Sequence, residues 1–165
     1  MRKWYHPSSV MPDKPWLHES AIQYLDSILE SDMNICEFGG GGSTLWFSER
    51  VKGVYTYENN PTWMTKLREI KNDNVYLFEE DISQVRFTGV PFDLVFIDGE
   101  PVGKRRDWLN IAPHISSTWV VLDNANRPEF AKERALLREY AELWNVINGN
   151  EPGTLYLVTE FWRIK

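Results

Sequence analysis

Short, continuous apolar runs alternate along this chain with longer stretches whose apolar residues recur at helical spacing. Continuous apolar runs are typical of strands buried on both faces, and amphipathic stretches are typical of helices that cover a sheet. Five runs have the length and composition of such strands: Asn34 to Phe38, Val54 to Tyr57, Val75 to Phe78, Phe92 to Ile97 and Thr118 to Leu122. The alternation predicts a parallel sheet with helices on both faces.

Helical spacing predicts five helices. The first extends from about Trp16 to Ser31, with Ile22, Leu25 and Ile28 on one stripe. Asn60-Pro61 is a helix start signal, because asparagine caps the first turn and proline suits its first position. Trp63, Leu67 and Ile70 lie at helical spacing in the helix that follows. The other helices are Ser43 to Arg50, the stretch between Gly103 and His114, and a long helix from Pro128 with the stripe Phe130, Leu137, Ala141 and Trp144.

The chain ends in a pattern that differs from the rest. A turn sequence, Gly149-Asn150-Glu151-Pro152-Gly153, separates two strand-like runs, Asn145 to Asn148 and Thr154 to Arg163. Two strands joined by a short turn pair in antiparallel fashion. The fold class expected is therefore α/β: a Rossmann-like, doubly wound, seven-stranded sheet that is mostly parallel, with an antiparallel C-terminal hairpin strand.

Length and composition predict a single domain. With 165 residues, 42% of them hydrophobic, residues 1–165 are enough for one good core and too few for a second domain of ordinary size. Residues 1–16 form an N-terminal arm rich in proline, and we expect it to be either a lid over the functional site or a disordered or packed extension.

Charge and cysteine content restrict the ligands and the cellular compartment that we expect. A net charge of −6 argues against nucleic-acid binding, which needs clustered Lys and Arg. The sequence contains no apolar stretch of membrane-spanning length and no signal peptide, and its single cysteine, Cys36, lies in an apolar strand. These features predict a cytoplasmic protein that binds a small-molecule substrate; a homodimer is a candidate assembly.

The strongest chemical signal follows the first strand. Four consecutive glycines, Gly39 to Gly42, connect this strand to the next helix. Glycine lets backbone approach a ligand closely, and the helix start that follows directs N–H groups at it. Glu58 ends the second strand, 19 residues after Gly39, where an acid can accept hydrogen bonds from a ribose. This layout predicts a site for a nucleotide-type cofactor.

The glycine spacing distinguishes between cofactors. A dinucleotide fingerprint requires a third glycine, which here falls on Thr44 or Leu45 depending on the starting glycine. The remaining pattern, Glu37-x-Gly39-x-Gly41-x-Ser43-Thr44, resembles the first motif of class I S-adenosylmethionine-dependent methyltransferases, in particular their small O-methyltransferase-like branch.

Three further motifs extend this resemblance over nearly the whole chain. The segment from Tyr55 to Asn60 is similar to the family's ribose motif, Glu80-Asp81 to its adenine-side acid, and Phe92 to Gly99 to its fourth motif. Any of Glu79, Glu80 and Asp81 remains a candidate for the adenine side. The resemblance implies S-adenosylmethionine as cofactor, bound by Glu37, Gly39, Gly40, Gly41, Ser43, Thr44, Glu58, Asn59, Asp81 and Asp98.

Acids at the ends of the fourth and fifth strands suggest a second site. Asp98, Asp123 and Asn124 supply the oxygen ligands that Mg²⁺ or another divalent cation prefers. The set is similar to the metal site of catechol-type O-methyltransferases, although Pro101 stands where that family has a lysine base. The alternative is that Asp98 supports the cofactor's methionine end and Asp123-Asn124 caps a loop.

The function predicted is methyl transfer from S-adenosylmethionine to a small-molecule or sugar-like acceptor, with oxygen preferred. Asp98 and Asp123 are the catalytic candidates for removing the acceptor's proton. His114 is expected to be a helix-end cation, and Lys104-Arg105-Arg106 a solvated helix face rather than a contact for an acidic substrate. Two alternatives remain: a nicotinamide-dependent oxidoreductase, and a non-catalytic module that binds a partner.

Overall fold

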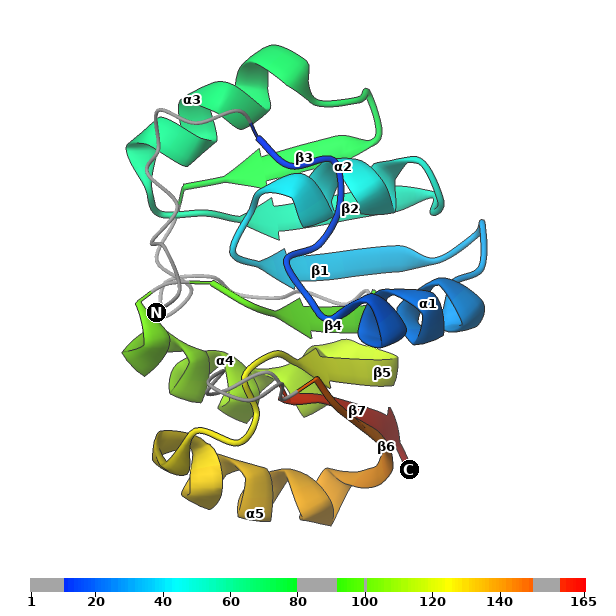
Figure 1. The fold of residues 1–165 in the computed structure, drawn as a ribbon, viewed down its shortest axis with the longest axis vertical. Coiled ribbons are helices and arrows are strands. Elements are labelled where there is room, and N and C mark those ends of the chain that lie inside the picture. Colours follow the sequence, from blue (N-terminus) through cyan, green and yellow to red (C-terminus); the bar gives the residue numbers. More distant parts are fainter. Residues whose placement is uncertain (1–10, 80–91, 100, 150–157) are drawn as a thin grey trace.

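The computed structural model describes residues 11–79, 92–99, 101–149 and 158–165. These residues form a seven-stranded sheet in the order β3-β2-β1-β4-β5-β7-β6 (Figure 1). The strands are β1 (Asn34–Phe38), β2 (Gly53–Tyr57), β3 (Val75–Phe78), β4 (Phe92–Ile97), β5 (Ser116–Leu122), β6 (Ala141–Asn148) and β7 (Val158–Ile164).

The pairing confirms the predicted fold class. Strands β3, β2, β1, β4 and β5 are parallel neighbours, whereas β7 is antiparallel to both β5 and β6. The parallel order places the carboxyl ends of β1, β2, β4 and β5 along one edge of the sheet, where ligands bind in open α/β folds. The helices are α1 (Glu19–Ile28), α2 (Gly42–Ser48), α3 (Pro61–Ile70), α4 (Val102–Ile115) and α5 (Ala131–Tyr140), with a 3₁₀ turn η2 (Pro128–Phe130) before α5.

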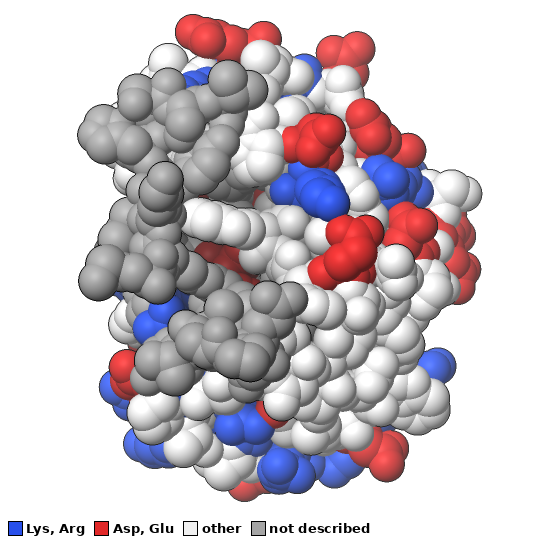
Figure 2. Space-filling view, in the orientation of Figure 1, with Lys and Arg blue, Asp and Glu red and all other residues white. Residues whose placement is uncertain are grey.

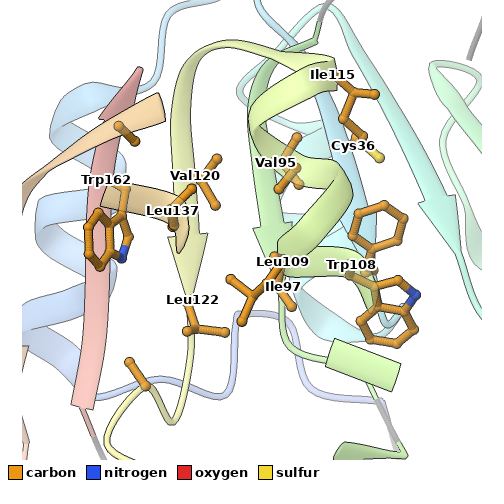
Figure 3. Close-up of a cluster of buried hydrophobic side chains, with 14 of the residues drawn as sticks. Cys36, Val95, Ile97, Trp108, Leu109, Ile115, Val120, Leu122, Leu137 and Trp162 are labelled. Carbon is orange, nitrogen blue, oxygen red and sulfur yellow. The ribbon is translucent and has the colours of Figure 1, made fainter. Parts of the chain in front are cut away.

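Two hydrophobic clusters cover the two faces of the sheet. On one face, side chains of α1 and α2 pack against β1, β2 and β4. On the other face, α4 and α5 supply Trp108, Leu109 and Leu137, which lie against β4 and β5 (Figure 3). Cys36 of β1 is buried in this second cluster, as expected for a small apolar side chain. Burial on both faces explains why these strands are continuous apolar runs.

Two predicted helices differ from those observed. The long helix from Pro128 ends at Tyr140, and the chain continues directly as β6, so Trp144 lies on a strand with about half of its surface exposed. The stripe predicted through Trp144 was wrong because residues 141–148 alternate between exposed and more buried positions and pair with β7. In α3 the buried residues are Met64 and Leu67, and Ile70 is exposed, so the predicted stripe through Ile70 was also wrong.

Charged side chains of both signs are interspersed over the upper right of the face shown in Figure 2. Over α1 and α2, for example, Arg50 forms ion pairs with Asp26 and Glu49. Within the described ranges, no helix is long and apolar enough to cross a membrane.

Candidate functional site

The acids at the carboxyl edge of the sheet lie on adjacent strand ends. Backbone hydrogen bonds continue the ladder beyond the strands: Gly39 N–H donates to Tyr57 O, Asp98 N–H to Phe38 O, and Asp123 N–H to Ile97 O, at 2.9 to 3.1 Å. The first residue after β1 is therefore adjacent to the first residue after β4, and that residue to the first after β5. The sheet itself brings the predicted site residues of these strands into one row.

Glu37, at the end of β1, is the polar centre of the glycine loop. It is fully buried, and three hydroxyl groups donate to its carboxylate: those of Ser43, Thr44 (2.6 Å) and Thr56 (2.8 Å). Thr44 Oγ1 also accepts from Gly41 N–H at 3.0 Å. Glu37 thus connects the loop to the start of α2 and to β2, and it shapes the loop from behind.

Burial raises the pKa of the Glu37 carboxyl to about 7, although the hydroxyls of Ser43, Thr44 and Thr56 lower it. Desolvation disfavours the charged form, and the hydrogen bonds from neutral hydroxyls compensate only in part. Near neutral pH the protonated form is therefore far more populated than in an ordinary glutamate.

The four glycines have different neighbours. Gly39 has φ +100°, and a Cβ there would lie 2.2 Å from Gly99 Cα. At Gly40 a Cβ would meet Leu67 and Thr56, and at Gly42 it would meet the carbonyl oxygens of residues 12 and 14. At Gly41, nothing lies within 4 Å of the added atom. Three glycines are thus required by packing, and Gly41 faces open space.

The N-terminal segment lies directly against this loop. The carbonyl oxygens of Pro12 and Lys14 approach Gly42 closely, and the chain then continues to α1 (Figure 1). Residues 1–10, the rest of the predicted arm, lie outside the described ranges.

Glu58, at the end of β2, is joined to the same loop. Its carboxylate accepts from Gly40 N–H at 2.9 Å and from Asn60 N–H at 2.5 Å. Burial raises its pKa, and these backbone N–H groups oppose that rise. The neighbouring Asn59 is exposed, while the Asn60 side chain caps α3 by accepting from Thr62 and Trp63 N–H. Glu58 is therefore fixed in place at the loop's edge.

Asp98 and Asp123 meet at the ends of β4 and β5, and a buried arginine lies beside them. Arg105 is 2% exposed and forms an ion pair with Asp98 at 3.1 Å; the Asp98 side chain itself is 23% exposed. Asp123 is buried, and it accepts from Thr159 Oγ1 at 3.3 Å. Burial, followed by the negative charge of Asp98, raises the pKa of Asp123 well above its ordinary value. Asp98 is thus the acid paired directly with the guanidinium, and Asp123 is the more deeply buried of the two.

The proposed metal ligands do not fit a divalent cation in this arrangement. Oxygens of Asp98 and Asn124 accept from the Arg105 guanidinium, which already supplies a positive charge at the position considered for a metal. In the part of the chain that the structure describes, no cluster of three His, Cys, Asp or Glu side chains is placed to hold a metal ion. The expectation that Arg105 lies on a solvated helix face was wrong, because its side chain is buried.

Other predicted residues lie elsewhere. Glu80 and Asp81 fall outside the described ranges. His114 is at the last turn of α4, as expected, with its ring 4.8 Å from the ring of Tyr140, in a groove between α4 and α5. Neither Asp98 nor Asp123 lines that groove.

Sequence reasoning missed Thr56 and Arg105. A signal for Arg105 was present: it shares the spacing of Trp108, Leu109 and Ala112 on α4, and all four are buried. A charged residue on an apolar stripe is buried with partners, and the strand-end carbonyls are those partners. Thr56 offered only its place on β2, opposite Glu37 of β1.

No protein-family model matches the sequence, and no curated protein sequence matches it. Solved structures do match the fold. NodS, an N-methyltransferase from Bradyrhizobium japonicum, superposes with a TM-score of 0.67 at 13% identity, covering 88% of this chain and 93% of that one. The same protein in complex with S-adenosyl-L-homocysteine gives 0.58 at 12% identity, covering 81% and 79%.

Two further structures show how widely the fold is used. A TehB-like S-adenosylmethionine-dependent methyltransferase from Corynebacterium glutamicum gives a TM-score of 0.64 at 14% identity, covering 87% of this chain and 86% of that one. A precorrin 8w decarboxylase from Methanobacterium thermoautotrophicum gives 0.64 at 18% identity, covering 95% and 100%. The chain therefore has the fold of the class I S-adenosylmethionine-dependent methyltransferases.

Proposed function

We propose that the protein transfers a methyl group from S-adenosylmethionine to a small-molecule acceptor. The observation that carries this proposal is the pairing of an open Cβ position at Gly41 with the Glu58 carboxylate, which Gly40 N–H holds at the edge of the same loop. The loop offers backbone at close range, and the acid beside it can accept hydrogen bonds from ribose hydroxyls. The likeness to methyltransferase structures supports the same cofactor.

In this proposal each strand end has its own part. Glu37 shapes the glycine loop from behind, with Ser43 and Thr44; Glu58 and Asn59 bind the ribose; Asp81 or a neighbouring acid faces the adenine. Asp98, whose side chain remains partly exposed, lies at the methionine end. The bound cofactor supplies an electrophilic methyl group on a sulfonium, and the protein's main task is to align the acceptor with it and exclude water.

The acceptor's chemistry follows from Asp98 and Asp123. Because Arg105 donates to one side-chain oxygen each of Asp98 and Asn124, we propose that the proton of the acceptor leaves to a carboxylate rather than to a metal-bound path. A carboxylate is a weak base, sufficient for an amine that has already attacked or for an acidic hydroxyl. We therefore propose a small molecule whose oxygen or nitrogen needs no strong base.

The first experiment is thermal unfolding with S-adenosylhomocysteine and, separately, with NAD. A ligand at 100 times its dissociation constant adds about 2.7 kcal/mol, which raises the Tm of a domain of this size by several degrees. We expect this rise with S-adenosylhomocysteine and none with NAD. A rise with NAD alone would favour the oxidoreductase, and a rise with neither would favour the partner-binding module.

A further inference from the structure

Arg105 is a fully buried cation that the proposed reaction does not yet use. It lies on α4, behind the strand ends that carry Asp98 and Asp123. We infer that Arg105 is a positioning residue: its guanidinium locks the ends of β4 and β5 together, so that the Asp98 carboxylate faces the ammonium group at the methionine end of the bound cofactor. This inference depends on the proposed function and adds to it.

The contacts of Arg105 join both strand ends. Its Nε donates to Gly99 O at 2.8 Å, and its Nη2 donates to Asp98 O at 2.8 Å. Its Nη1 donates to Asp123 O at 3.0 Å. One planar group thus binds the main chain after β4 and after β5. A lysine ammonium is a single point charge and cannot span the same three carbonyls with the same geometry.

The same guanidinium orients two side chains. Nη2 donates to Asp98 Oδ1 at 3.1 Å, and Nη1 lies 3.4 Å from Asn124 Oδ1. Asn124 has φ +55°, a conformation that asparagine tolerates better than most residues. The rotamer of Asp98 and the turn after β5 are therefore held by one residue.

Arg105 also acts on the glycine loop through Gly99. The Gly99 carbonyl that Arg105 binds belongs to the residue packed against Gly39, where a Cβ would lie 2.2 Å from Gly99 Cα. Trp108, one turn further along α4, also lies against Gly99, where an added Cβ would be 2.6 Å from its ring, and it stacks on Phe38 of β1 at 5.2 Å. Through Arg105 and Trp108, α4 thus fixes Gly99, and Gly99 in turn limits the position of Gly39 in the glycine loop.

Asp98 offers an ammonium a carboxylate that is both oriented and partly exposed. A buried guanidinium needs a paired anion, and Asp98 provides it while keeping part of its surface exposed. An ammonium that approaches Asp98 therefore meets a carboxylate whose orientation Arg105 already fixes.

The test compares two ligands by calorimetry. S-adenosylhomocysteine carries the amino-acid group, whereas 5′-methylthioadenosine has the same nucleoside and sulfur without it. In Arg105→Gln we expect binding of S-adenosylhomocysteine to weaken about 10- to 100-fold, the worth of a charge-assisted hydrogen bond, and binding of 5′-methylthioadenosine to change less than about twofold. Arg105→Lys should recover part of the loss.

The matched control is Arg106→Gln. Arg106 is the next residue on α4, half-exposed, and its Nε pairs with Glu133 rather than with the strand ends. We expect both ligands to bind this variant as they bind the wild-type protein. If Arg105→Gln weakens both ligands equally, or neither, Arg105 is only a structural tie and the inference is wrong.

Two further outcomes of this experiment have their own criteria. If Arg105→Gln does not fold, Asp98→Asn takes its place, and it must lose S-adenosylhomocysteine selectively; normal binding there would overturn the inference. If the wild-type protein binds neither ligand, the proposed function fails, and the inference fails with it. Selective loss in the variants requires wild-type binding, so the two failures cannot be confused.

Discussion

The two halves of the candidate site stabilise their acids with different kinds of partner. At the ends of β1 and β2, Glu37 and Glu58 accept hydrogen bonds from neutral groups: hydroxyls in one case and backbone N–H in the other. At the ends of β4 and β5, Asp98 is paired with the guanidinium of Arg105, and Asp123 lies beside them.

The two halves also differ in how far along the sequence the partners of their acids lie. Ser43 and Thr44 follow Glu37 within the same motif, so the neutral half assembles from residues close in sequence, with Thr56 added by the neighbouring strand. The charged half depends on a helix that turns back over the sheet and inserts Arg105 between two strand ends. The charged half should therefore depend on a single side chain, that of Arg105.

The largest expected effect is at Gly39. Gly39→Val forces a side chain into φ +100° and against Gly99, so it should lower the free energy of unfolding by about 3 kcal/mol or more and abolish binding of S-adenosylhomocysteine. Denaturant unfolding and calorimetry measure both. The matched variant is Gly41→Ala, which adds a methyl group in open space. It should leave the free energy of unfolding nearly unchanged and weaken the binding of S-adenosylhomocysteine. Equal destabilisation by the two would show that the loop glycines share one role.

The second prediction concerns pH. Glu37 has a pKa of about 7 in the folded protein against an ordinary 4.5, so between these values the folded state binds a proton that the unfolded chain has lost. The free energy of unfolding should therefore fall as pH rises through this window, by about 3 kcal/mol from this group. Glu37→Gln cannot ionise, and it should flatten that fall.

Urea unfolding at about pH 5 and about pH 8 measures this slope. Glu58 and Asp123 also have raised pKa values, so part of the fall should persist in Glu37→Gln. An unchanged slope in this variant would mean that Glu37 is ionised throughout and that its hydroxyl partners fully offset burial.

The third prediction is a smaller effect at Glu58. Glu58→Ala removes the acid proposed for the ribose, and it should weaken binding of S-adenosylhomocysteine by about 1.5 to 3 kcal/mol. Calorimetry measures it, with the exposed Glu30→Ala as control. Unchanged affinity in Glu58→Ala would place the ribose elsewhere and would leave Glu58 as a support for Gly40.

The smallest effect is expected from metal ions. Because Arg105 occupies the oxygens of Asp98 and Asn124, a chelator should not change the affinity for S-adenosylhomocysteine, and added Mg²⁺ should not raise the Tm. A Mg²⁺-dependent rise in Tm that disappears in Asp123→Ala would support the metal site at the ends of β4 and β5.

Much of the fold could be predicted from the sequence because its signals are local. The runs for β1, β3 and β4 have the same bounds in the structure as in the sequence pattern, since continuous apolar segments with polar ends can be recognised without knowing their neighbours. The end of α5 could not be predicted in this way. Residues 141–144 fit a helical stripe as well as a strand, and only pairing with β7 decides between them.

The α/β class, the glycine loop and the acids that end β1, β2, β4 and β5 could be predicted without the structure, because they follow from periodicity and from motifs of adjacent residues. Tertiary structure alone decided which glycines are packed and which one is open, and that the cation beside Asp98 is Arg105. Those facts depend on contacts between segments far apart in the chain, such as Gly39 with Gly99 and Arg105 with Asp123. Such distances cannot be read from local sequence, because the packing of α4 on the sheet sets them.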